Sequence, residues 1–144
     1  MSEIETLLPH RDPFLFVDSV EVVDETHFVG TYRFNPANPI FKGHFPEFPV
    51  VPGVLMVECM AQCGGAGLAK AGRIRPDSGI LLASILSAKF RRTVRPGDAI
   101  TFEIETLKST RRILCQRGKA LVDGNVATEA EWVCMVGGIP SDSP

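Results

Sequence analysis

The central stretch of this chain, PGVLMVECMAQCGGAGLAK (residues 52 to 70), is almost wholly apolar. Pro52 suits the first turn of a helix, where its missing N–H is not needed, and Gly72 lies just beyond the expected end as a stop. Within the run VLMVECMAQ only Glu58 and Gln62 are polar. A helix that is apolar on all sides is a buried one. We therefore expect one long helix at the centre of the protein.

Strands are expected on both sides of this helix. The flanking segments are rich in β-branched and aromatic residues with polar residues interleaved, a pattern typical of strands. Short turns join the later ones, so we predict an antiparallel sheet wrapped around the helix, an α+β fold. About six strands are expected, in residues 14 to 24, 26 to 34, 80 to 94, 99 to 110 and, as a hairpin around Asp123–Gly124, 113 to 136.

The remaining segments complete a single expected domain, residues 1 to 144. Residues 1 to 8 should hold a short N-terminal helix that stops before Pro9. Residues 35 to 53 carry five prolines and are predicted to be a loop without regular structure. The tail GGIPSDSP, residues 137 to 144, is expected to be frayed.

Composition excludes several classes of protein. The net charge of −2 argues against a non-specific nucleic-acid binder. No apolar run approaches the roughly 20 residues that span a bilayer, and the N-terminus MSEIETLL lacks the features of a signal peptide, so we expect a cytoplasmic protein without a membrane partner. The four cysteines are expected to be free thiols, and Cys59 and Cys63 lack companions for a zinc set, so no metal is expected.

Two ionisable residues are candidates for chemistry. Burying Glu58 without partners would cost about several kcal/mol or force its protonation, so it is either a paired structural residue or a tuned acid. His44, in the proline-rich loop, is either a polar packing residue or a fixed base, and Gly43 before it should permit close backbone approach. The N–H of Gly53, at the start of the helix, is a donor for a developing oxyanion. Base, acid and donor would suit a carbonyl compound.

Four stretches, in the same order along the chain, carry a family resemblance. They are LLPHRDPFLFVD (7 to 18), GHFPEFPVVPGVLMVECMAQ (43 to 62), FRRTVRPGD (90 to 98) and ALVDGNVATEA (120 to 130). Together they resemble the 3-hydroxyacyl-[acyl-carrier-protein] dehydratases of type II fatty acid synthesis, the FabZ type. The resemblance implies the hotdog fold, an antiparallel sheet around one long helix, which agrees with the pattern of strands and helix.

The resemblance also implies roles for five residues. His44 matches the family's catalytic histidine, and Glu58 its catalytic glutamate. Sister enzymes that also isomerise their product carry aspartate at the latter position, so Glu58 favours a simple dehydratase. Gly53 matches the glycine whose N–H holds the thioester oxygen, Val50 the residue whose carbonyl orients the histidine, and Gln62 a polar residue near the reacting centre.

The implied reaction converts a (3R)-3-hydroxyacyl thioester on acyl carrier protein to the trans-2-enoyl thioester and water. His44 would remove a proton from C2, while Glu58 would protonate the C3 hydroxyl, or orient a water while the histidine performs both transfers. No cofactor or metal is required. In the family the two residues of one site come from two subunits, which implies a homodimer, often assembled further into a trimer of dimers.

An acidic carrier protein requires a basic docking surface. Candidates are Lys89, Arg91, Arg92 and Arg95, although the same charges would also serve only to solvate a sheet edge.

The acyl tunnel is expected to depart from the family pattern. Many members carry a Gly-Ile-Asp-like tripeptide where this chain has Ser84–Ile85–Leu86. Acyl length, coenzyme A as an alternative carrier, and a specialised lipid or polyketide pathway therefore stay open. The competing hypotheses are a hotdog acyl thioesterase and a non-catalytic subunit that binds acyl carrier protein.

Overall fold

A computed structural model describes residues 1–137, so the expected frayed tail lies outside the described residues except for Gly137. The elements, in chain order, are α1 (Glu3–Leu7), β1 (Ser19–Val22), β2 (His27–Tyr32), the 3₁₀ helix η1 (Pro39–Lys42), α2 (Gly53–Lys70), β3 (Ile80–Phe90), β4 (Ile100–Ser109), β5 (Ile113–Val122) and β6 (Asn125–Val136). Within this range no helix is both long and apolar enough to cross a membrane.

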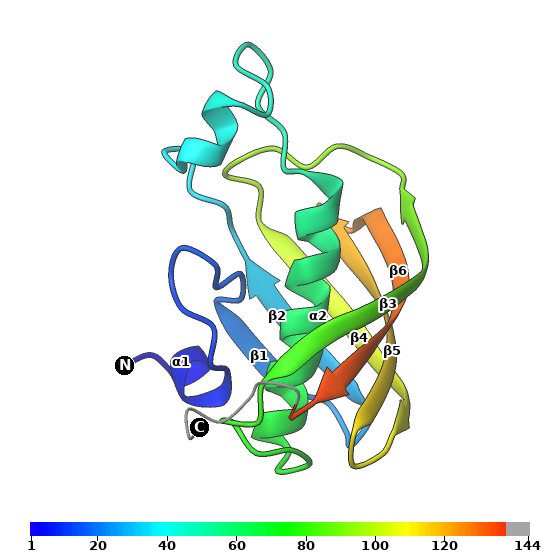
Figure 1. Ribbon diagram of the computed structural model, residues 1–144. Coiled ribbons are helices and arrows are strands. Elements are labelled where there is room, and N and C mark those ends of the chain that lie inside the picture. The colour runs from blue at the N-terminus through cyan, green and yellow to red at the C-terminus, as the bar shows by residue number, and fades with distance from the viewer. Residues whose placement is uncertain (138–144) are drawn as a thin grey trace.

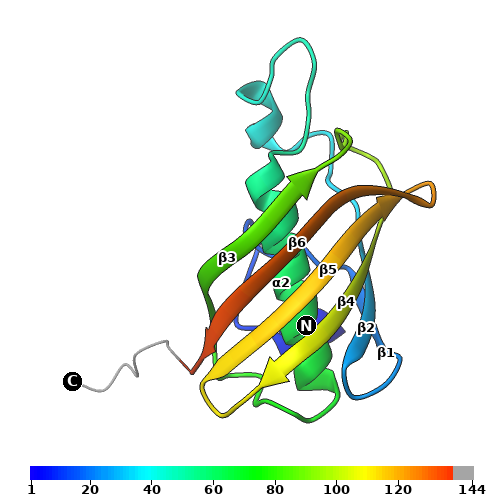
Figure 2. The ribbon, with the colours of Figure 1, turned by 90° about the vertical axis from the view of Figure 1, so that its right-hand side faces the viewer.

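The six strands form one antiparallel sheet in the order β1-β2-β4-β5-β6-β3. The sheet curls around α2, which runs along its inner face (Figure 1). Seen from the outer face, β3 forms one edge and the short β1 lies at the other (Figure 2). This arrangement confirms the predicted sheet around a central helix.

The central helix begins and ends where the sequence predicts. Pro52 is its N-cap residue, and at the other end Gly72 adopts a φ of +74°. There the N–H of Arg73 donates to Leu68 O (2.8 Å) and that of Gly72 to Ala69 O (3.0 Å), which is a Schellman motif. From residue 56 to residue 69 every residue except Glu58 is buried.

The glycines of α2 let side chains of the sheet approach the helix closely. A methyl group at Gly67 would overlap the Phe28 ring of β2, and one at Gly64 would overlap the Gln116 amide of β5. Both neighbours are fully buried in the core beneath the helix. The helix therefore sits deep in the curl of the sheet because side chains, and not another backbone, fill the space beside its glycines.

The hairpin prediction is confirmed, whereas two predicted strands are shorter than expected. Asp123 and Gly124 have φ values of 53° and 76° between β5 and β6, the positive values that a two-residue turn of this kind needs. The strand expected over residues 14 to 24 covers only Ser19–Val22. The one expected over residues 80 to 94 ends at Phe90, after which the chain turns away from the edge of the sheet.

The proline-rich segment contains one short regular element that the sequence does not predict. Asn38 caps η1 through its side chain, which accepts a hydrogen bond from the N–H of Ile40. Pro39 occupies the first position of the turn, where no N–H is required. The prolines thus shorten the helical structure to a single turn and do not abolish it.

Candidate active site

The loop that carries His44 is closed by two reciprocal hydrogen bonds. The N–H of Val50 donates to His44 O (3.0 Å), and the imidazole Nδ1 of His44 lies 3.0 Å from Val50 O. Because a carbonyl oxygen can only accept, Nδ1 carries the hydrogen. In the neutral ring Nε2 then keeps its lone pair, so the loop presents an imidazole ready to accept a proton there.

Contacts from outside the loop fix its position. The N–H of Val51 donates to Val94 O (2.7 Å), and Nε of Arg95 donates to Pro49 O (3.2 Å). The Arg95 guanidinium also stacks over the Phe48 ring at 4.2 Å from its centroid, a cation–π contact. Arg95, predicted as a carrier-docking residue, therefore holds the His44 loop in place.

His44 and Gly53 line the same cavity, of about 500 Å³, at the start of α2. The N–H of Gly53 opens the helix, so no carbonyl of α2 can accept from it, and the positive end of the helix points the same way. A Cβ at Gly53 would lie 2.7 Å from the Phe90 ring. At Gly43 a Cβ would approach only Ile40 O, at 3.9 Å, so the close approach expected there occurs at Gly53 instead.

Glu58 lies in a second, much smaller cavity, of about 10 Å³, between α2, the N-terminal segment and the edge of the sheet. Its side chain is 20% exposed, so within one chain the expected buried acid is only partly covered. Oε2 of Glu58 accepts a hydrogen bond from Nε2 of Gln62 (2.9 Å). Gln62 in turn accepts from the N–H of Phe16 (2.8 Å) and donates to Phe14 O (3.2 Å).

The two hydrogen bonds from the Gln62 side chain to the backbone of Phe14 and Phe16 explain why β1 is shorter than predicted. The backbone of Phe14 to Phe16 is paired with the buried Gln62 side chain, so it does not pair with a strand. The phenylalanines that favour a strand here form an aromatic cluster instead, with the Phe16 ring centroid 5.6 Å from that of Phe34. The residues therefore support the Glu58 cavity and do not extend the sheet.

His10 is a member of this cavity that sequence reasoning missed. Its Nε2 lies 3.8 Å from Oε2 of Glu58. Burial lowers the pKa of His10, and the neighbouring Glu58 carboxylate opposes that shift. The only sequence signal is its place beside Pro9 in LLPHRDPF, because nothing in the local pattern relates it to a helix 48 residues further along the chain.

His44 and Glu58 line different cavities of one chain. The Glu58 cavity is bordered by Ile80 and Leu82 of β3, the edge strand. This strand is paired on one side only, with β6, and exposes large apolar side chains such as Leu81, Ile85 and Leu86. A long, apolar, unpaired edge is a template for another chain.

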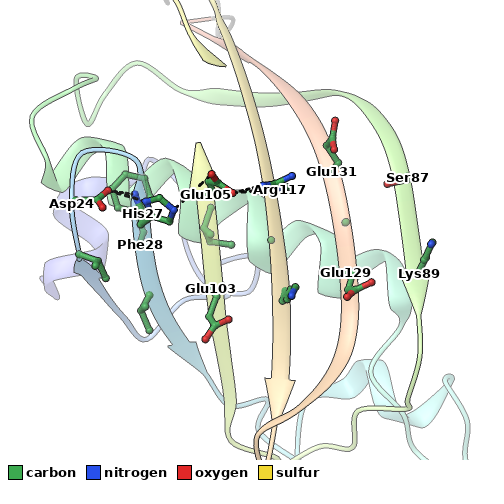
Figure 3. Close-up of a pocket in the computed structure, with 16 residues that line it drawn as sticks. Asp24, His27, Phe28, Ser87, Lys89, Glu103, Glu105, Arg117, Glu129 and Glu131 are labelled. Atoms are coloured by element: carbon green, nitrogen blue, oxygen red, sulfur yellow. Dashed lines mark hydrogen bonds and ion pairs between the residues drawn. The ribbon is translucent and has the colours of Figure 1, made fainter. Parts of the chain in front are cut away.

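A groove of about 790 Å³ lies elsewhere, on the outer face of the sheet. Acidic and basic side chains alternate across its strands, and Figure 3 shows the ion pairs that join Asp24, His27, Glu105 and Arg117. Lys89 faces this groove, whereas Arg91 and Arg92 line the His44 cavity. Three of the four predicted docking residues are therefore divided between two surfaces, and the fourth, Arg95, packs on the His44 loop.

Metal and thiol chemistry have no assembled site in the part of the chain that the structure describes. Residues 1–137 contain no cluster of three or more histidine, cysteine or acidic side chains able to hold a metal ion. The four cysteines are free, and burial raises the pKa of Cys63 and of Cys134 to about 12. Both therefore act as small core residues.

Comparison with known proteins identifies the family. A family model described as a FabA-like domain matches residues 8–131. The 3-hydroxyacyl-[acyl-carrier-protein] dehydratase FabZ of Actinobacillus pleuropneumoniae is 44% identical over 136 residues, which cover 93% of this chain and 88% of that protein. The FabZ of Nitratiruptor is 40% identical over 140 residues, 93% of this chain and 95% of that protein. The chain belongs to the FabZ dehydratase family.

Solved structures confirm the hotdog fold of this FabZ-family chain. The dehydratase heterocomplex ApeI:P from Xenorhabdus doucetiae matches with a TM-score of 0.78 at 15% identity, over 99% of this chain and 94% of that chain. An uncharacterised protein from Pyrococcus horikoshii matches with a TM-score of 0.65 at 13% identity, over 94% and 95%. At these identities the likeness concerns the fold alone.

The segment Ser84–Ile85–Leu86 of this FabZ-family member coincides with an irregular part of the sheet. The β3–β6 register shifts between Leu82 and Ser84 and again between Ile85 and Ser87. Ser84 and Ile85 therefore lie between two irregularities, and Leu86 lies within the second, on the edge strand that borders the Glu58 cavity. All three residues are exposed, so they lie at the edge of the sheet and outside its core.

Proposed function

We propose that this FabZ-family protein removes water from (3R)-3-hydroxyacyl thioesters of acyl carrier protein, giving trans-2-enoyl thioesters for fatty acid biosynthesis. The observation that carries the proposal is the His44 cavity. It combines an imidazole whose Nδ1 is tied to Val50 O at 3.0 Å with the N–H of Gly53 at the positive end of α2. A base beside an oxyanion donor suits removal of the proton next to a thioester carbonyl.

The proposed reaction proceeds through charge on the thioester oxygen. Nε2 of His44 takes the proton from C2, and the N–H of Gly53 with the α2 terminus stabilises the negative charge that grows on the oxygen. The C3–O bond breaks as Glu58 protonates the hydroxyl, directly or through one ordered water. The products are the enoyl thioester and water, with one proton gained by His44 and one lost by Glu58.

The separation of His44 from Glu58 supports a site shared between two subunits. Each residue lines its own cavity, and the exposed apolar edge of β3 borders that of Glu58. We infer that a second copy pairs along β3 and that His44 of the partner subunit faces Glu58. The proposed unit is thus a homodimer, and further assembly into a trimer of dimers stays a prediction, as does the cytoplasmic location.

Arg91 and Arg92 are the proposed contacts for an acidic carrier protein, because they line the cavity that contains His44. Arg91 is already paired with Glu129 at 2.9 Å, which leaves Arg92 as the stronger candidate. The proposal gives Lys89 and Arg95 no part in docking, since they face the outer groove and the His44 loop, respectively.

Hydration of a trans-2-enoyl thioester, followed at the enoyl ultraviolet absorbance, tests the function in the reverse direction. His44→Ala and Glu58→Gln should each lower turnover by about 10²–10⁴-fold, the usual contribution of one proton-transfer group, with the fold retained by circular dichroism. Release of free thiol without change at the double bond would instead indicate a thioesterase. Wild-type-like turnover in either variant would remove that residue from the mechanism.

A further inference from the structure

Two nitrogen groups, one from α2 and one from the N-terminal segment, face the same oxygen of Glu58. The amide Nε2 of Gln62 lies 2.9 Å from Oε2, and the imidazole Nε2 of His10 lies 3.8 Å from the same atom. Oε1 has neither contact. The two oxygens of the carboxyl group therefore occupy chemically different surroundings.

The orientation of the Gln62 amide is fixed by the backbone. Its Oε1 accepts from the N–H of Phe16 at 2.8 Å, so the amide nitrogen must occupy the opposite position, toward Glu58 and Phe14 O. An amide nitrogen only donates, and Oε2 of Glu58 is thus an acceptor in both protonation states. When Glu58 is a neutral acid, its proton stands on Oε1.

The backbone at His10 is held by Arg11. The Arg11 guanidinium donates to three backbone carbonyls around it, Leu8 O (2.8 Å), His10 O (2.7 Å) and Glu5 O (3.0 Å). Nδ1 of His10 is buried and has no hydrogen-bond partner among the described residues, whereas Nε2 faces the Glu58 carboxyl group. The ring hydrogen is therefore favoured on Nε2, where an acceptor is close.

We propose that His10 is a positioning residue for Glu58: its Nε2–H and the Gln62 amide together hold Oε2, keep the acidic proton on Oε1 and stabilise the carboxylate that forms when that proton leaves. The inference rests on the proposed function, in which Glu58 is the acid. As negative charge develops on Glu58, a small movement of the two side chains toward each other would shorten the 3.8 Å distance between His10 Nε2 and Glu58 Oε2 to that of a hydrogen bond.

The remaining ionisable groups around the pair stay constant in charge near neutral pH. Burial raises the pKa of Cys59 on α2 and of Cys134 on β6, so both thiols stay neutral. Arg11 stays charged and is paired with Glu5 of α1 at 3.7 Å. A change in the pH profile of a His10 variant therefore does not come from these three groups, and it reports on His10, on Glu58 or on the His44 that the proposed function places opposite Glu58 from a second copy.

Two substitutions of His10 distinguish the effect of its N–H donor from the effect of its side-chain volume. His10→Gln keeps an N–H near the place of Nε2, whereas His10→Leu removes it. We expect His10→Leu to lower kcat for enoyl hydration and dehydration by about tenfold, the effect of one hydrogen bond to a charged group, with KM and Tm unchanged. His10→Gln should retain most of the rate. The pH profile of dehydration should change in His10→Leu, because the imidazole that titrates beside the Glu58 carboxyl group is absent.

A double-mutant cycle shows whether His10 acts through Glu58. In a Glu58→Gln background, His10→Leu should cause no further loss, since the group that it assists is absent. If His10→Leu unfolds, His10→Asn replaces it, because asparagine carries its N–H near Nδ1 and should show the same loss with the fold retained. An active wild type with unchanged kcat and pH profile in the donor-lacking variant would overturn the role of His10 alone. A wild type without hydration activity would overturn the proposed function as well.

Discussion

The His44 loop and the Glu58 cavity are built in opposite ways. The loop is closed within seven residues by the paired bonds of His44 and Val50, and it is supported by Val94 and Arg95 of the same chain. The Glu58 cavity draws on the N-terminal segment, α2 and β3, and it lies beside an edge strand that residues 1–137 leave uncovered. One half of the proposed site is complete in a single chain, and the other is not.

This difference indicates where a second chain contributes. A preorganised base needs no partner to hold its tautomer, so the His44 loop can be presented outward to another subunit. A carboxylic acid in a partly open cavity becomes dry only when something covers the edge. Pairing along β3 would supply both the cover and, from the partner, the base.

Mixing inactive subunits gives the largest expected effect on this comparison. His44→Ala and Glu58→Gln proteins should each be about 10²–10⁴-fold impaired alone. A mixed dimer, formed by co-expression with two different tags, contains one site with both native groups and one with neither. We therefore expect about half of the wild-type turnover per dimer, measured by enoyl hydration after tandem purification.

The control for subunit mixing is a dimer in which both subunits carry the same substitution but different tags. Such dimers contain no intact site and should stay inactive. Failure of the mixed dimer to regain activity would show that each chain assembles its own site, and the division between the two regions would then lose its functional meaning.

Charge on the β3 edge should separate the subunits. Leu86→Lys places an ammonium on an edge residue that is 58% exposed, and lysine on an edge strand opposes pairing with another chain. We expect sedimentation to show a monomer with retained secondary structure. Its turnover should fall about 10²-fold or more, because no Glu58 cavity is then covered and supplied with a base.

Leu107→Lys is the matched control, since Leu107 is an exposed leucine on β4, away from the edge. It should leave both assembly and activity as in the wild type. A monomeric Leu86→Lys protein with full turnover would contradict the shared site.

The fold and the nearness of His44 to Gly53 could be predicted from the sequence because their signals are local. The apolar run with Pro52 and Gly72 at its ends predicts α2, and Asp123–Gly124 predicts the β5–β6 turn, each from neighbouring residues. His44 and Gly53 lie only nine positions apart, on either side of a stiff loop. Local sequence was sufficient wherever local contacts build the structure.

Prediction from the sequence was incomplete where distant residues meet. The pattern of Phe14 to Phe16 favours a strand, but the Gln62 side chain takes up their backbone groups, and no local signal reports that competition. His10 was missed for the same reason, because its partner Glu58 comes from another element. The close approach assigned to Gly43 occurs at Gly53, where the ring of Phe90 arrives from the edge strand.

Gly53→Ala tests how sensitive the reaction is to a small displacement in the His44 cavity. Its Cβ would lie 2.7 Å from the Phe90 ring, so Gly53→Ala must displace either the ring or the start of α2. A displacement of this size at an oxyanion donor should cost up to about 10²-fold in kcat, with a smaller change in KM. Gly43→Ala, beside His44 but with open space around it, should be nearly silent.

Relief of the clash provides the second arm of this experiment. Phe90→Ala in the Gly53→Ala background should recover part of the lost rate, because the methyl group then has room. No recovery would show that the N–H of Gly53 is misplaced by the helix itself and not by the ring.

The smallest expected effect lies outside both regions, in the β1–β2 turn. Oδ1 of Asp24 accepts from the N–H of Thr26 at 2.9 Å and lies 3.0 Å from Nδ1 of the His27 ring. These bonds, led by that of Thr26, lower the pKa of Asp24 from 3.8 to about 2. Because the folded-state pKa is the lower one, the stabilisation is complete above about pH 4 and is lost as the pH falls toward 2.

Asp24→Asn keeps an acceptor but does not titrate, so its Tm should fall less than that of the wild type between pH 4 and pH 2, by a small margin expected for an exposed group. Enoyl hydration at pH 7 should be unchanged in Asp24→Asn, because the turn lies outside both halves of the site. An identical dependence of Tm on acid pH in both proteins would show that this turn does not contribute to the acid sensitivity of the fold.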